Sequence, residues 1–169
     1  MTVAAKLDLD NYLPYLVNRV GSIIAEQYEG EALAPYRLSI AMWRVAVVLA
    51  EKGGQRQIDL ADLTSIEVST LSRIVTRLVR LGVVTRTRSP SSTREVMVKL
   101  TAKGKAQVAR LIPIARRYEA DAGAGLSTEE LAALKNSLRR VYGNMKRRAG
   151  AIAEAPQRQG RLRTAAAAK

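Results

Sequence analysis

The spacing of apolar residues changes at Gly82, and this change limits the folds that the chain can adopt. Over about residues 68–81 the apolar side chains recur at the 3.6-residue period of an amphipathic helix, which Gly82 is well placed to end in a left-handed conformation. Beyond Gly82 the segments VVTRTR and REVMVK alternate in the manner of strands around the sequence SPSS. This alternation predicts a two-stranded hairpin with a tip of four residues or slightly more.

Helical spacing also predicts three helices before this one and two after the hairpin. The expected helices cover residues 8–29, Ser39 to the Gly53-Gly54 stop, about 59–64, a segment that begins at Thr101, and a segment that follows residues 127–130. Pro113 should bend or break the helix from Thr101, whereas Ser127 and Glu130 have the spacing of a capping box. A short helix, a tight turn, a longer helix and a hairpin follow one another as in a winged helix-turn-helix, so we expect a mainly α fold with a small β-hairpin wing.

The formal net charge of +13 is concentrated in one block of the chain. Residues 1–67 carry 6 basic and 9 acidic side chains, whereas residues 68–118 carry 12 basic side chains and a single acid, Glu95. Residues 119–169 carry 10 basic and 5 acidic side chains. A solvated surface without a charged partner usually mixes both signs, so the central block favours nucleic acid as its partner, ahead of an acidic membrane or protein.

Composition argues against several other classes of protein. The chain has no Cys and no His, which excludes the usual zinc and iron–sulfur sites, thiol redox sensing and His-based catalysis. The acids show no paired arrangement, so we expect no enzyme, no cofactor and no metal site. No stretch approaches the roughly 20 apolar residues of a membrane span, and the first residues lack the order of a signal peptide. We expect a cytoplasmic protein of a bacterial or archaeal cell, associated with the nucleoid when bound.

The outward face of the predicted helix 68–81 combines short hydroxyl side chains with guanidinium groups and carries no acid. Arg side chains pair well with guanine in the major groove, and hydroxyls and the helix N-terminus can hold phosphates. Arg side chains on a projecting hairpin suit the narrow minor groove. The predicted DNA contacts are Ser69, Thr70, Ser72, Arg73, Thr76, Arg77, Arg80, Arg86, Arg88 and Arg94.

Other interpretations of this face remain open. An ordinary solvated helix would carry acids between its Arg residues. A non-specific architectural DNA binder would bind all sequences almost equally, and a winged helix that binds protein would show no salt-sensitive DNA binding.

The stretch DLADLTSIEVSTLSRIVTRLVRLGVVTRTRSPSSTREVMVKLTAKG, residues 59–104, resembles the MarR (multiple-antibiotic-resistance regulator) family of transcription regulators. It contains in order a Leu-Ala pair, a turn, a Ser/Thr–Arg helix, a Leu-x-x-x-Gly-Val-Val-x-Arg link, a wing and a Leu-Thr-x-x-Gly close, and the looser outline covers residues 10–148. The resemblance places the recognition helix at Val68–Arg80 and the minor-groove Arg at Arg94. The family usually has Asp two residues before that Arg, where this chain has Ser92.

The resemblance implies a homodimeric repressor that binds a pseudo-palindromic duplex operator and is released by a small-molecule effector, often an aromatic carboxylate. It implies a dimerisation region at residues 1–37 and 105–150 and a DNA-binding domain at 38–104, and residues 151–169 would form a basic, disordered tail. Its effector pocket would lie between these parts. Candidates are Tyr12, Tyr15, Arg19, Tyr36, Arg37, Trp43 and Arg44, although Trp43 could belong to the core and Arg19 and Arg44 could make surface or intersubunit pairs.

Overall fold

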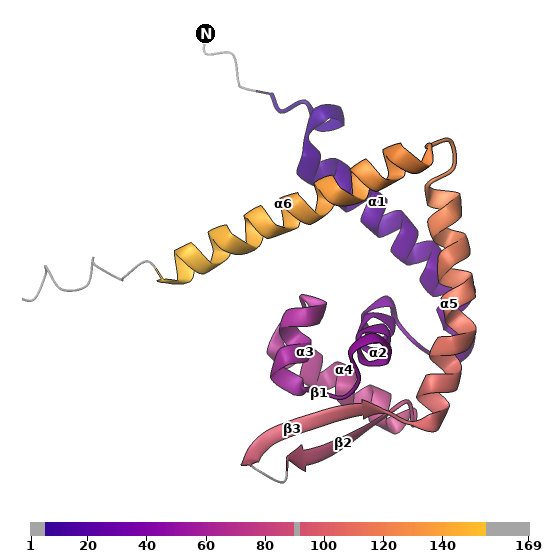
Figure 1. Ribbon diagram of the computed structural model, residues 1–169, viewed down its shortest axis with the longest axis vertical. Helices are drawn as coiled ribbons and strands as arrows, with labels where there is room; N and C mark the ends of the chain where they lie inside the picture. Colours follow the sequence, from indigo (N-terminus) through magenta and orange to yellow (C-terminus); the bar gives the residue numbers. More distant parts are fainter. Residues whose placement is uncertain (1–5, 90–91, 155–169) are drawn as a thin grey trace, which may run out of the picture. The chain divides into compact units, whose positions relative to one another are not determined.

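The computed structural model describes residues 6–89 and 92–154, and within this part the side chains of residues 88–89, 92–95 and 152–154 are left out. Contacts within the chain divide it into two compact units, Met1–Ala122 and Gly123–Lys169. In the first unit, helices α2 (Ile40–Lys52), α3 (Gln57–Thr64) and α4 (Val68–Arg80) gather beside a small sheet, and α5 (Ala102–Ala122) leads away from it (Figure 1).

The N-terminal helix is shorter than predicted. A 3-10 turn, η1 (Leu9–Asn11), precedes α1 (Leu13–Tyr28), and Tyr12 between them has an extended backbone. A single helix over 8–29 would need a hydrogen bond from the backbone nitrogen of Pro14, which carries no proton. Pro14 therefore lies in the first turn of α1, where that nitrogen needs no partner.

The segment between the first two expected helices is itself helical. It consists of a π-helical segment, η2 (Glu29–Leu33), and a 3-10 turn, η3 (Ala34–Tyr36). The next helix, α2 (Ile40–Lys52), begins as predicted, because the Ser39 hydroxyl accepts a hydrogen bond from the backbone nitrogen of Met42 at 3.3 Å.

A short and a long helix form the predicted helix-turn-helix. Helix α3 (Gln57–Thr64) ends at Ser65, which is left-handed with φ of 53°, and α4 (Val68–Arg80) begins three residues later. Gly82 then adopts a φ of +70°, which confirms it as the left-handed residue after α4.

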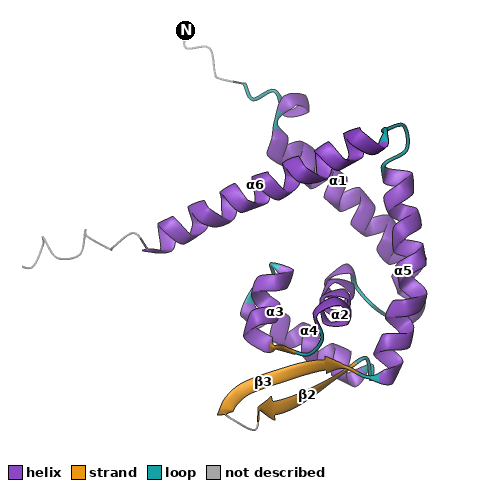
Figure 2. Ribbon diagram, viewed as in Figure 1, coloured by secondary structure: helices purple, strands orange, loops and turns teal. Residues whose placement is uncertain are grey.

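The wing is part of a three-stranded antiparallel sheet. Strands β2 (Val84–Ser89) and β3 (Ser92–Leu100) form the predicted hairpin, and Ser89 pairs with Ser92 at its far end. The sequence did not predict β1 (Gln55–Arg56), which pairs with the other edge of β3 and gives the order β1-β3-β2. Among the described residues, strands occur in this sheet alone (Figure 2).

The Leu-Thr-x-x-Gly segment joins the wing to α5 (Ala102–Ala122). The Thr101 hydroxyl donates to the carbonyl of Gly82 at 2.7 Å and accepts from the backbone nitrogen of Gly104 at 2.9 Å. A Cβ at position 104 would lie 2.1 Å from the carbonyl oxygen of Val83, so this close approach requires glycine.

Pro113 does not break α5, contrary to one of the two predicted outcomes. The helix continues because buried residues on both sides of Pro113 hold it against the core. Leu111 is fully buried, and Ile114 and Tyr118 pack against the core from the following turn.

The second unit contains α6 (Thr128–Glu154), which starts with the predicted capping box. The Ser127 backbone nitrogen donates to the Glu130 carboxylate at 2.7 Å, and the Glu130 backbone nitrogen donates to the Ser127 hydroxyl at 3.2 Å. Helix α6 extends into the range 151–169 that was predicted as a tail, and residues 155–169 lie outside the described part.

Within the described residues, no single helix has the length and apolar composition to cross a membrane. The bent pair Leu13–Tyr36 and Ile40–Lys52 together reaches the length and apolar composition of a membrane span. The same residues contain no group of three or more Asp or Glu side chains that could hold a metal ion.

Candidate nucleic-acid interface

Helix α4 has one buried and one exposed side. Leu71, Val75 and Leu78 are completely buried and belong to the main core, whereas Arg73 and Arg77 are exposed. An amphipathic helix places residues in this way when its apolar stripe anchors it to the rest of the domain. The guanidinium groups are therefore held outward on a firmly packed element.

The exposed side of α4 contains a shallow hollow of about 360 Å³. Its lining consists of five residues of the predicted reading surface, namely Ser72, Arg73, Thr76, Arg77 and Arg80. The Thr76 hydroxyl donates to the backbone carbonyl of Ser72 at 2.9 Å, which fixes its orientation on the helix. Three cations and two hydroxyls in one concave surface can accept a polyanion or the edges of bases.

The N-terminal end of α4 is occupied by a carboxylate of the chain itself. Glu67 accepts hydrogen bonds from the Ser69 hydroxyl and from the backbone nitrogen of Thr70, the latter at 3.1 Å. These bonds, led by that from the Ser69 side chain and assisted by the positive charge of Arg73, hold the pKa of Glu67 below its usual range. Arg73 in turn donates to the Thr70 hydroxyl at 3.3 Å.

Arg86 connects three elements of the winged helix. From strand β2 its Nη2 donates to the Gln57 side chain of α3 at 2.6 Å and to the Ser72 hydroxyl of α4 at 3.4 Å. Arg86 was predicted as a DNA contact, and the structure shows that one of its nitrogens binds within the protein. Arg88 and Arg94 lie in the strands of the wing, but their side chains are outside the described part.

Sequence reasoning missed two residues that border this surface, Glu67 at the N-cap of α4 and Gln57 on α3. Glu67 directly precedes Val68 but gave only a weak signal, because the residues that usually mark an N-cap are Ser, Thr, Asp and Asn. Gln57 had no such signal, since its partner Arg86 is 29 positions away.

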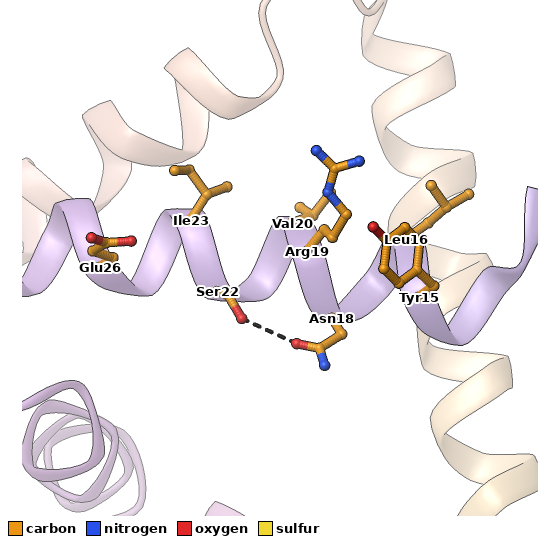
Figure 3. A pocket seen from close by; sticks show the side chains of 8 residues that line it. All are labelled: Tyr15, Leu16, Asn18, Arg19, Val20, Ser22, Ile23 and Glu26. Atoms are coloured by element: carbon orange, nitrogen blue, oxygen red, sulfur yellow. Dashed lines mark hydrogen bonds between the residues drawn. The ribbon is translucent and has the colours of Figure 1, made fainter. Parts of the chain in front are cut away.

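The predicted effector residues divide into two groups. Tyr15 and Arg19 lie together on α1, where the guanidinium carbon of Arg19 is 5.6 Å from the centre of the Tyr15 ring. Both line an open hollow of about 590 Å³ on this helix (Figure 3). Figure 3 also shows the Ser22 hydroxyl directed at the Asn18 side chain, with a hydrogen bond of 3.1 Å. Tyr12, near the start of the same helix, is exposed.

The other candidates lie at the core or between elements. Trp43 is half-buried and its ring centre is 5.8 Å from that of Tyr28, while Tyr36 packs against the same core. Arg44 donates to the backbone carbonyl of Thr64 at 3.3 Å, and Arg37 has a left-handed backbone at the end of η3. The described structure does not bring these residues into one pocket with Tyr15 and Arg19.

A second hollow of about 610 Å³ lies between α1 and α5 in the first unit, and the sequence did not predict it. Val20, Ile23 and Ile114 give it an apolar wall, and Arg117 adds a cation. The Tyr118 hydroxyl at its side donates to the Glu31 carboxylate, and this hydrogen bond is the main reason that the pKa of Tyr118 is raised to about 12.

Comparisons with known proteins agree with this architecture. The sequence profile of the MarR family matches residues 38–96. An HTH-type transcriptional repressor of Mycobacterium tuberculosis is 27% identical over 132 residues, which are 78% of this chain and 94% of the relative. The crystal structure of a MarR family transcriptional regulator from Silicibacter pomeroyi is 30% identical, with a TM-score of 0.72 and coverage of 83% of this chain and 96% of that one.

Two less similar structures share the fold. E. coli MarR, solved as a mutant complexed with operator DNA, is 24% identical with a TM-score of 0.72, and the match covers 81% of this chain and 99% of that one. BpsR of Bordetella bronchiseptica, solved to explain the regulation of its DNA binding by 6-hydroxynicotinic acid, is 23% identical with a TM-score of 0.71, and the match covers 77% and 98%.

Proposed function

Because the chain belongs to the MarR family of transcriptional regulators, we propose that it binds a pseudo-palindromic operator as a homodimer and represses transcription until a small molecule releases it. Residues 38–104 bind DNA in this proposal, and residues 1–37 and 105–150 form the dimer. The observation that carries the proposal is the exposed, carboxylate-free surface of α4, held out by a completely buried underside.

The recognition step is the insertion of α4 into the major groove. Arg73 and Arg77 are exposed on a helix whose packing fixes their position, so they can reach base edges without a rearrangement of the domain. The E. coli relative of the same fold, solved with operator DNA, supports this use of the fold. Neutralisation of phosphates by the basic block makes the affinity fall steeply with salt.

The dimer is supported by apolar side chains that the described chain leaves exposed. Val20 and Ile23 on α1 are 56% and 51% exposed, and Leu138 and Met145 on α6 are 41% and 58% exposed. Stripes of this kind usually mark a protein interface. A two-fold dimer would present its two recognition helices to successive major grooves about 34–36 Å apart, which requires a pseudo-palindromic site.

The effector is an aromatic or other apolar carboxylate in this proposal. Both hollows on α1 combine an apolar wall with a guanidinium group, from Arg19 in one and Arg117 in the other, and both also contain carboxylates, Glu26 in the first and Glu31 and Asp121 in the second. The apolar wall and the guanidinium group would bind the ring and the carboxylate of a small organic anion, and the acids would favour anions that can also donate a hydrogen bond. The Bordetella protein, whose DNA binding is regulated by 6-hydroxynicotinic acid, supports this chemical class. The effector acts by favouring a spacing of the two recognition helices that does not match the operator. The coupling free energy between effector binding and DNA binding would be roughly 1–3 kcal/mol.

The test is selection of bound fragments from genomic DNA by the full chain at physiological salt. We expect a small set of fragments with a two-fold symmetric motif, bound about 10³-fold or more tightly than scrambled duplexes. Binding that hardly varies with sequence would contradict the proposal and favour an architectural DNA binder. Absence of salt-sensitive binding would favour a winged helix that binds protein. Addition of 6-hydroxynicotinic acid or a benzoate to the selected complex then tests release.

A further inference from the structure

Glu67 is an acid at the edge of a surface that otherwise consists of cations and hydroxyls. It lies at the N-cap of α4, is exposed, and is near enough to Arg73, six positions later, to interact with its charge. A helix N-terminus without a carboxylate offers its free amide groups to phosphate. In this chain the first amide groups of α4 face the Glu67 side chain, and Thr70 donates to it at 3.1 Å.

The contacts of Glu67 extend to two residues of the reading surface. The Ser69 hydroxyl donates its proton to the carboxylate, so this hydroxyl has only its lone pairs to offer to DNA. The charge of Glu67 also acts on Arg73, which donates to the Thr70 hydroxyl in the same turn. The start of α4 therefore carries a hydrogen-bond network that includes a negative group.

We propose that Glu67 is a specificity-determining residue, which keeps phosphates away from the first turn of α4 and so weakens binding to DNA without the operator sequence. This inference rests on the proposed function and deepens it. In an operator complex, base contacts fix the depth and register of α4, so Glu67 keeps a constant position relative to the backbone. On other sequences phosphate contacts alone supply the affinity, and the carboxylate excludes phosphate from the helix end that would bind it best.

The charge of Glu67 is maintained at neutral pH by the same contacts. Hydrogen bonds from Ser69 and Thr70 lower the pKa of the carboxyl group, and the positive charge of Arg73 acts in the same direction. The repulsion of phosphate is therefore present under the conditions in which the protein would search DNA.

The experiment compares the full chain with three variants on two duplexes, the operator selected as above and a scrambled duplex of equal length and composition. Glu67→Ser removes the charge but retains a good N-cap, and Glu67→Asp retains both. Glu129→Ser is the matched control, because Glu129 is an exposed acid in the first turn of α6. Thermal unfolding of each variant verifies that the fold is intact.

We expect Glu67→Ser to bind the scrambled duplex about threefold to tenfold more tightly, with a salt dependence steeper by about one phosphate contact. Operator affinity should change by less than about twofold, since the base contacts remain. Glu67→Asp and Glu129→Ser should behave as the unmodified chain.

Three results would overturn the inference. An equal gain for Glu129→Ser would show that only net charge matters. An unchanged preference for the operator in Glu67→Ser would show that the carboxylate has no part in discrimination. A loss of operator affinity without a gain on the scrambled duplex would assign Glu67 to helix capping or to a base contact. Each differs from failure of the proposed function, in which the unmodified chain itself prefers no sequence.

Discussion

The winged-helix part and the terminal helices bury their apolar residues to different extents. In α4, Leu71, Val75 and Leu78 have no exposed surface, because α2, α3 and the sheet supply the rest of the core. On α1 and α6, comparable side chains such as Ile23 and Leu138 are about half exposed, at 51% and 41%. One chain is therefore sufficient to complete the DNA-binding part, whereas the terminal helices need a partner to cover them.

The largest expected loss of operator affinity comes from a charge on the α6 stripe, the exposed apolar side chains of Leu134, Leu138, Tyr142 and Met145. Leu138→Glu would place a carboxylate in the proposed dimer interface, where its burial is costly. We expect the dimer to dissociate and operator affinity to fall about 10²–10⁴-fold, because each head then binds its half-site independently. Sedimentation measures the mass, and titration with the operator measures the affinity.

Asn136→Glu is the control for that variant, since it adds the same charge two positions away, about 200° around the helix. It should leave the dimer intact. A dimer that persists in Leu138→Glu would show that the α6 stripe is not the interface, and the comparison between the two regions would then lose its explanation.

The next largest effect concerns the reading surface. Arg73→Ala or Arg77→Ala should reduce operator affinity by roughly 5–150-fold, the usual value of a base-reading Arg, while the dimer remains. Lys52→Ala is the control, because Lys52 is an exposed cation at the end of α2 that pairs with Glu51. Footprints that are unchanged in both Arg variants would reject α4 as the reading helix.

Local signals predicted most of the fold from the sequence. The Ser39 and Ser127 caps and the left-handed Gly82 depend on neighbouring residues, and each is confirmed. Strand β1 was missed because it has only two residues, and these form a strand by pairing with β3, more than 40 positions away. Of the two outcomes predicted at Pro113, a bend or a break, the break does not occur, since core packing on both sides outweighs the local cost of proline.

The candidate site shows the same division between local and distant information. The outward direction of Arg73 and Arg77 follows from the helical period alone. The hydrogen bond from Arg86 to Gln57 joins a strand to a helix 29 positions earlier, and no sequence period indicates it. The effector candidates also depend on contacts between distant elements: the Trp43 ring lies near that of Tyr28 and does not line the α1 hollow, which agrees with the alternative that Trp43 belongs to the core.

A smaller loss of operator affinity is expected from variants at the hydrogen bond that joins the wing to α3. Gln57→Ala removes the acceptor of the 2.6 Å hydrogen bond and leaves Arg86 in place. If Arg86 acts by positioning the wing, Gln57→Ala and Arg86→Ala should each weaken operator binding by about threefold to tenfold, and the double variant should be no worse than Arg86→Ala. Additive losses would instead show that Arg86 contacts DNA independently of Gln57.

The smallest expected effect comes from truncation after Arg148, which tests how far the partner-dependent region extends. The exposed apolar side chains that the structure describes on α6, including Leu138 and Met145, lie before this point, so the shortened chain should retain its fold and its dimer. The removed residues carry four basic side chains and one acid, so operator affinity at low salt should fall by less than about threefold, and the difference should vanish as salt is raised. Unfolding and sedimentation measurements on the two chains check this. Loss of the dimer would move the interface beyond Arg148 and show that the end of α6 belongs to the region that a second copy covers.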